Sequence, residues 1–258
     1  MKVRVFADAH AAGRAAAREV ARQLREKPGS VLGLATGHTM IPVYGELVRL
    51  REEGGLSFQQ AVTFNLDEYV GLGEGAPDSF REFMNLRLVK QVDLAAGSFH
   101  IPNGLAPDPA AACRAYEQLI RDAGGMDLVL LGLGRNGHIG FNEPGSPPDS
   151  RTRVVRLTEV TRRSNGDDFR FLRETPDEAI TMGIATILEA RRILLAVTGW
   201  EKAEVLSRVL LSRPTSELPA SFLHTHPDVT LIADGEAMEA YLAAVGDSGI
   251  AFTVGPPA

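Results

Sequence analysis

A short segment after one apolar run combines three side-chain types that handle protons. The run is Met126–Leu131 (MDLVLL), which has the length and composition of a buried strand. The segment Leu131–Ser146 (LGLGRNGHIGFNEPGS) follows it directly. This segment carries the amide of Asn136, the imidazole of His138 and the carboxylate of Glu143 among glycines. Sites in α/β proteins are built on loops at strand ends, so these residues predict acid–base catalysis.

The glycines of this segment also match the spacing of a dinucleotide-binding loop, at Gly132, Gly134 and Gly137. That pattern has meaning only where the third glycine opens a helix and an acidic residue ends the next strand. Here the chain continues as HIGFNEPGSPPDS, whose glycines and prolines exclude a helix of useful length. The next apolar run, Arg153–Leu157 (RVVRL), ends in Thr158. The residues therefore argue against nucleotide binding.

A pair of acids follows a second strand-like run. Asp67 and Glu68 come directly after Ala61–Leu66, within the segment FNLDEYVGL. One interpretation is that the acids cap the helix that follows the strand. The other is that they face a cleft, because Gly71 and the long loop GLGEGAPDS argue against an immediate helix.

A glycine turn lies between the strand-like run Val31–Ala35 and a helical segment. It consists of Thr36, Gly37, His38 and Thr39. Free backbone N–H groups at a helix N-terminus attract anions, and a glycine lets the backbone approach a phosphate closely. A plain strand-to-helix turn is an equally good interpretation of these residues alone.

Strand-like and helix-like segments alternate along the chain. The strand-like runs are Lys2–Phe6, Val31–Ala35, Ala61–Leu66, Met126–Leu131, Arg153–Leu157, Ala179–Met182, Arg192–Val197 and Val229–Ala233. The helical segments are Ala17–Leu24, Ile41–Glu53, Phe80–Lys90, Ala110–Ala123, Ile184–Ala190, Glu201–Leu211 and Glu236–Ala244. This alternation predicts an α/β fold with a Rossmann-like, mostly parallel sheet flanked by helices. We expect a single domain over residues 1–258, with an insertion around residues 140–180.

Composition excludes several kinds of partner. The net charge of −6 is dispersed over 258 residues without a basic patch, so we expect no nucleic-acid partner. No apolar run approaches the length of a membrane span, and the first ten residues lack the apolar core of a signal peptide. The lone Cys113 excludes an internal disulfide and fits the cytoplasm. His224 and His226 have no clear third ligand nearby, so we expect no metal.

Taken together, these segments resemble the glucosamine-6-phosphate deaminase (isomerase) family. The resemblance rests on FNLDEYVGL, on GxGxxGHIGFNEP, on the turn ATGHT and on SRTRVVRL at Ser150–Leu157, and it extends from about Val31 to Val229. The related 6-phosphogluconolactonases share the fold and a similar loop around the histidine. They typically lack the FNxDEY segment and the Asn-Glu-Pro ending.

The resemblance implies a reaction that needs neither cofactor nor metal. A pyranose ring opens, a proton moves from C2 to C1, and ammonia leaves C2 of an amino-sugar phosphate. His138 suits ring opening because imidazole titrates near neutral pH, with Glu143 holding its other nitrogen. Asp67 matches the base that removes the C2 proton, and Asn136 is expected to be a hydrogen-bond partner. Glu68 is left with a structural role.

The resemblance also implies a phosphate site, with departures. Relatives hold the sugar phosphate in the turn Thr36–Thr39 and with a lysine that matches Lys202. His38 stands where relatives usually carry Gly or Ser. Many relatives also use an arginine after an Asn-Ser or Asn-Ala pair, where this chain has an acid at Asp167. The candidates to replace that arginine are Arg162, Arg163 and Arg170.

Some relatives are hexamers activated by an acetylated amino-sugar phosphate. Arg153 and Ser146 match two residues of that activator site, but Val155 stands in place of its lysine. We therefore expect weak or absent activation, and assembly into a homo-oligomer is left open.

Three other functions remain compatible with the residues. A deaminase of the galactosamine epimer would use the same chemistry. A 6-phosphogluconolactonase-type hydrolase would need activated water but no enolisation base. A non-catalytic sugar-phosphate sensor would bind without turnover, although the acid–base residues argue against it.

Overall fold

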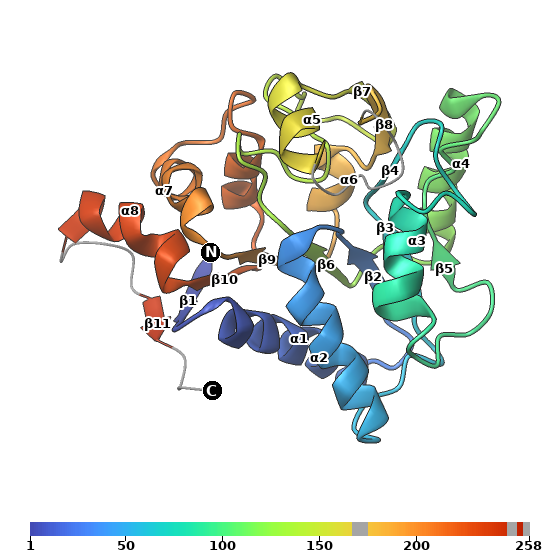
Figure 1. Ribbon diagram of the computed structural model, residues 1–258, viewed down its shortest axis with the longest axis horizontal. Coiled ribbons are helices and arrows are strands. Elements are labelled where there is room, and N and C mark those ends of the chain that lie inside the picture. The colour runs from blue at the N-terminus through green and yellow to red at the C-terminus, as the bar shows by residue number, and fades with distance from the viewer. Residues whose placement is uncertain (167–174, 247–251, 255–258) are drawn as a thin grey trace.

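The computed structural model describes residues 1–166, 175–246 and 252–254, with a parallel eight-stranded sheet at its centre (Figure 1). In spatial order the strands are β11 (Phe252–Val254), β1 (Lys2–Phe6), β10 (Val229–Asp234), β9 (Arg192–Val197), β6 (Leu128–Leu131), β2 (Val31–Leu34), β3 (Val62–Asn65) and β5 (Phe99–His100). Every neighbouring pair runs parallel. The predicted α/β class and mostly parallel sheet are confirmed.

The central strands are short and apolar because both faces of the sheet are covered. β2 and β6 are buried at every position, and β9 is buried everywhere except at its first residue. Strands buried on both faces are expected to be continuous apolar runs rather than alternating ones. Their side chains join one large hydrophobic core, and polar residues appear where the strands end.

Helices cover the sheet on both sides. They are α1 (Ala9–Glu26), α2 (Ile41–Glu52), α3 (Phe80–Met84), α4 (Pro109–Asp122), α5 (Glu159–Gly166), α6 (Ile184–Leu188), α7 (Ala203–Leu211) and α8 (Gly235–Val245). In the view of Figure 1, α1 and α2 lie below the sheet, and α5, α6 and α7 lie above it. Within the described residues, no helix combines the length and apolarity that crossing a bilayer needs.

Short 3-10 and π turns begin or extend several helices. They are η1 (His38–Met40), η2 (Asn85–Val89) and η3 (Trp200–Lys202), while η4 (Pro219–Thr225) stands by itself between α7 and β10. The helix predicted over Phe80–Lys90 is thus α3 continued by the π turn η2. The helix predicted from Glu201 begins as η3 and becomes α-helical at Ala203. Helix α5 was not predicted, because its sequence EVTRRSNG is polar and only eight residues long.

A second, antiparallel sheet stands on the carboxyl side of the main one. It consists of β4 (Asp67–Tyr69), β8 (Glu178–Thr181) and β7 (Arg153–Arg156), in that order. β7 and β8 were predicted as strands, but their membership of a separate sheet was not. β7 alternates between half-buried and exposed residues, as expected for an antiparallel sheet with one open face. β4 was missed because three residues are too few for a periodic pattern.

Candidate active site

The carboxyl ends of β2, β3, β6 and β9 surround one cleft of about 530 Å³. This volume lies within the usual range for small-molecule sites. The predicted residues that line the cleft are Thr36, Gly37, His38, Thr39, Asp67, His138 and Lys202. Asn136 and Glu143 do not line the cleft, and both instead lie next to Nδ1 of His138. The structure thus brings together side chains from four separate strand ends.

The loop after β6 is shaped to bring His138 back over its own backbone. A Cβ atom at position 134 would lie 2.2 Å from Nε2 of His138, so only glycine leaves room for the imidazole. No helix begins between Gly132 and Ser150, as expected from the glycines and prolines of this segment. The dinucleotide-binding interpretation is therefore excluded by the geometry as well as by the sequence.

An amide stands between the imidazole and the carboxylate. Nδ2 of Asn136 donates to Oε2 of Glu143 over 2.6 Å, and Oδ1 of Asn136 lies 2.8 Å from Nδ1 of His138. A carboxylate only accepts hydrogen bonds, which fixes the amide with its oxygen toward the imidazole. Nδ1 of His138 therefore carries the proton and donates it to this oxygen. Nε2 is left as the proton acceptor, above Gly134, which lines the cleft.

This arrangement corrects one expectation. Glu143 was expected to hold the second nitrogen of His138 directly, but its Oε2 lies 3.6 Å from Nδ1. The carboxylate orients the imidazole through the amide of Asn136 and acts on it directly only through its charge. Burial alone would raise the pKa of Glu143, but the facing His138 and the hydrogen bonds at this carboxylate outweigh burial and lower the pKa to about 2. Glu143 is thus a fixed negative charge beside the imidazole.

Asp67 reaches the cleft as the first residue of β4, just beyond the end of β3. It is only 5% exposed, and it pairs in the small sheet with Thr181. The hydroxyl of Thr181 accepts from the backbone N–H of Phe141 over 3.0 Å, which ties the two catalytic segments together. Burial, and then the charge of Glu68, raise the pKa of Asp67 to about 8. A carboxylate of this kind is a stronger base than an exposed one.

Glu68 serves the fold rather than the cleft. Its carboxylate accepts from the backbone N–H groups of Tyr69, Phe80 and Arg81 over 2.9, 3.0 and 2.9 Å. It therefore caps the start of α3, where unpaired N–H groups need an acceptor. Both interpretations of the acid pair hold, one for each residue: Asp67 faces the cleft and Glu68 caps the following helix.

The turn after β2 also lines the cleft and can present backbone N–H groups to it. Gly37 has a φ of 104°, a conformation that other residues rarely adopt, and η1 and α2 follow directly. Lys202, which also lines the cleft, follows the turn after β9. Burial, and then the charge of Arg135, lower the pKa of Lys202 to about 8. A bound anion would stabilise the charged form of this lysine. The turn and Lys202 together can therefore bind a phosphate.

The arginines proposed in place of the usual phosphate ligand lie elsewhere. Arg162 pairs with Asp177 over 2.8 Å and Arg163 pairs with Glu159, and neither lines the cleft. Arg170 and Asp167 lie outside the described residues.

Several residues around the cleft were not predicted. Arg135 and Glu201 form an ion pair at the rim, and His10 at the start of α1 lines the cleft beside them. Arg135 lies within the loop that carries Asn136 and His138, so its place in the sequence could have identified it as a cleft residue. Thr161, whose hydroxyl is 3.4 Å from Nδ1 of His138, comes from the unpredicted helix α5.

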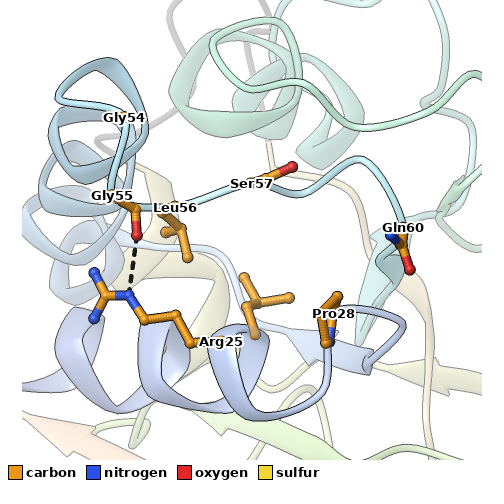
Figure 2. A pocket seen from close by; sticks show the side chains of 8 residues that line it. Arg25, Pro28, Gly54, Gly55, Leu56, Ser57 and Gln60 are labelled. Carbon is orange, nitrogen blue, oxygen red and sulfur yellow. Dashed lines mark hydrogen bonds between the residues drawn. The ribbon is translucent and has the colours of Figure 1, made fainter.

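A second hollow of about 360 Å³ lies at the opposite edge of the sheet, where β2 and β3 begin (Figure 2). Figure 2 shows Arg25 donating from Nε to the carbonyl of Gly55, a contact of 2.9 Å. Among the described residues, Arg25 is the only ionisable side chain that lines this hollow, and a guanidinium does not exchange protons near neutral pH. His224 and His226, considered above as a metal pair, each donate from Nε2 to a backbone carbonyl over 2.8 Å.

Fold and site define an α/β enzyme with acid–base side chains in a cleft at the carboxyl ends of parallel strands. The sequence profile of the family described as Glucosamine-6-phosphate isomerases/6-phosphogluconolactonase matches residues 7–232. The chain belongs to this family.

Individual relatives divide the family further. A protein of Geobacillus sp. (strain WCH70) named glucosamine-6-phosphate deaminase is 49% identical over 216 residues, which are 84% of this chain and 86% of the relative. The solved structure of a monomeric glucosamine-6-phosphate deaminase has a TM-score of 0.90 at 46% identity and covers 93% of this chain and 100% of that chain. The 6-phosphogluconolactonase from Trypanosoma brucei has a TM-score of 0.74 at 20% identity, covers 92% of this chain and 97% of its own, and shares the fold alone.

Proposed function

We propose that this protein is a glucosamine-6-phosphate deaminase, which converts glucosamine 6-phosphate and water to fructose 6-phosphate and ammonia. Relatives of that name are 46–49% identical over most of the chain. The observation that carries the proposal is Asp67, a buried carboxylate with a raised pKa in the same cleft as His138. Deamination needs a base at C2, and lactone hydrolysis does not.

Ring opening is the first step. Nε2 of His138 takes the proton from O1 of the sugar and returns a proton to O5, which leaves an aldehyde at C1. Nδ1 keeps its proton throughout and donates it in a hydrogen bond to Oδ1 of Asn136. The charge of Glu143 stabilises the imidazolium that exists between the two proton transfers. The neutral amide of Asn136 suffices for this role, because Glu143 supplies the negative charge.

Proton transfer and loss of ammonia follow. The carboxylate of Asp67 removes the proton from C2, which is acidic because it lies next to the C1 carbonyl, and C1 then gains a proton. The nitrogen on C2 becomes an imine, water adds to C2, and ammonia leaves as the ketone forms. Because no electrons are transferred between molecules, proton transfer by side chains suffices.

The first experiment measures ammonia release from glucosamine 6-phosphate, with galactosamine 6-phosphate and unphosphorylated glucosamine in parallel. We expect rapid release from glucosamine 6-phosphate and slow release from both others. Hydrolysis of 6-phosphogluconolactone is measured on the same preparation, and turnover of the lactone without ammonia release from any amino sugar would overturn the proposal.

We expect no activation by N-acetylglucosamine 6-phosphate. Arg153 is half-buried and donates to Oδ1 of Asn142 over 2.8 Å and to Oγ of Ser146 over 3.1 Å, so its guanidinium is already occupied. Val155 packs against the small apolar cluster of the second sheet and supplies no second cation. The initial rate with subsaturating glucosamine 6-phosphate should therefore stay within about twofold when the acetylated sugar is added. A rise of tenfold would contradict this prediction.

We place the enzyme in the cytoplasm, on the strength of Cys113. This thiol is buried in α4 and unpaired, as is usual in a reducing compartment.

A further inference from the structure

An arginine at the rim of the cleft is held by a single carboxylate. Nη2 of Arg135 lies 2.6 Å from Oε2 of Glu201, and the two side chains are 47% and 45% exposed. Arg135 belongs to the loop after β6 and Glu201 to η3 after β9, so the pair joins two neighbouring strand ends. Half-exposed pairs of this kind contribute little to stability, so the pair is free to exchange partners.

This arginine shares one end of the cleft with the other anion-binding groups. Arg135, Lys202 and the turn at Gly37 all line the same cavity. Lys202 follows Glu201 directly in sequence, and the charges of Arg135 and Glu201 both reach its ammonium. Near Glu201 the cleft therefore holds two cations and one carboxylate, an excess of positive charge that suits a phosphate dianion.

The other candidate arginines have different partners. Arg162 is turned to Asp177 and to the carbonyl of Thr175, and Arg163 lies on the outer surface of α5 with Glu159. Within the described part of the chain, Arg135 is the arginine that lines the cleft. Arg135, Lys202 and the turn follow three adjacent strands of the sheet, β6, β9 and β2.

We propose that Arg135 binds the substrate phosphate together with Lys202 and the Gly37 turn, in the role that many relatives give to an arginine after an Asn-Ser or Asn-Ala pair. This proposal rests on the proposed function for the identity of the phosphate ester. In the free enzyme, Glu201 holds the guanidinium in place and competes with the phosphate for it. When the dianion binds, Arg135 exchanges one carboxylate oxygen for two phosphate oxygens, which a planar guanidinium can contact at once.

The test replaces Arg135 by Met, with Arg163→Met as the matched control. We expect R135M to raise KM for glucosamine 6-phosphate about 10- to 100-fold while kcat changes less than about threefold, since a charge-assisted hydrogen bond is lost in substrate and transition state alike. R163M should match the wild type in both constants. A structural role for Arg135 would instead lower kcat or the melting temperature.

A binding measurement keeps this result separate from the proposed function. Calorimetric titration with inorganic phosphate needs no turnover, and R135M should weaken phosphate binding by the same factor as KM. E201Q should tighten it, because the competing carboxylate is gone. The third candidate arginine is tested with Arg170→Met. The role of Arg135 would be overturned if R135M bound phosphate within twofold of the wild-type affinity, or if R170M and not R135M lost phosphate binding. Absence of ammonia release by the wild type would overturn only the proposed function.

Discussion

Replacing Asp67 by Asn should abolish ammonia release while leaving the protein folded. The amide cannot accept the C2 proton, and a positioned general base contributes about 10²- to 10⁴-fold to rate. We expect kcat to fall within that range with little change in KM, because the proposed phosphate contacts come from other residues of the cleft, the turn at Gly37 and Lys202. Steady-state ammonia release at saturating glucosamine 6-phosphate measures this. A variant that keeps a tenth of the wild-type rate would contradict the assignment.

The pH dependence gives the same assignment a second readout. Asp67 acts as a base only when ionised, and burial raises its pKa to about 8. In the wild type, kcat/KM should therefore rise with pH toward about 8, and it should fall at higher pH as Lys202, whose pKa is also about 8, loses the charge that binds the phosphate. The residual activity of D67N should lack the rising limb. A wild-type profile already flat from pH 6 would place the base elsewhere.

The free energy of unfolding provides a control for D67N, because the change that the variant should cause has a predictable sign. A carboxyl whose pKa is raised on folding stabilises the protein fully below its ordinary value of 3.8, and that contribution is lost as the pH rises toward about 8. An amide has no charge to bury, so D67N should gain stability relative to wild type across this interval. Urea unfolding at pH 5 and pH 9 checks it: the difference should favour the variant more strongly at pH 9. Loss of activity with that result is chemical and not a folding defect.

The place of the site could be predicted from the sequence, because it depends only on which residues follow the carboxyl ends of parallel strands. Three apolar runs of strand length precede the candidate residues: one comes before the Gly37 turn, one before Asp67 and one before the loop with His138. The carboxyl ends of parallel strands meet at one edge of a sheet. The structure puts those three ends, and that of the strand before Lys202, side by side. Local apolar patterns were therefore enough to bring the candidate residues into one cleft.

The family resemblance implied separate roles for Asp67 and Glu68, but local patterns alone could not predict them, because they depend on a strand that has no sequence pattern. β4 is three residues long, and successive side chains of a strand point to opposite faces. This alternation sends Asp67 to the cleft and Glu68 to the N-terminus of α3. In a loop, which the glycines after Tyr69 favoured, neighbouring side chains would have no fixed relation.

Contacts between loops that are distant in sequence could not be predicted from local sequence patterns either. Arg135 and Glu201 are 66 positions apart and meet only because β6 and β9 are neighbours in the sheet. Strand adjacency of this kind does not follow from the order of elements along the chain. The intervening amide of Asn136 was close enough in sequence, but whether it lay between His138 and Glu143 depended on the path of a glycine-rich loop.

Replacing His138 by Gln should slow turnover at the ring-opening step. Glutamine fits the space above Gly134 but has no nitrogen that both accepts and returns a proton near neutral pH. We expect kcat to fall about 10²- to 10⁴-fold, again with KM little changed. Because glucosamine 6-phosphate is mostly cyclic in solution, the variant should depend on the open-chain form that arises spontaneously.

A partner variant shows whether the network acts as described. E143Q keeps the shape of the carboxylate but removes the charge that faces Nδ1 over 3.6 Å, so the imidazolium formed during ring opening loses its counter-charge. Its rate should lie between those of the wild type and H138Q. If Glu143 acts only through His138, the double variant H138Q/E143Q should be no slower than H138Q, because the charge has no imidazolium left to stabilise. A multiplicative loss in the double variant would instead mean that Glu143 contacts the substrate itself.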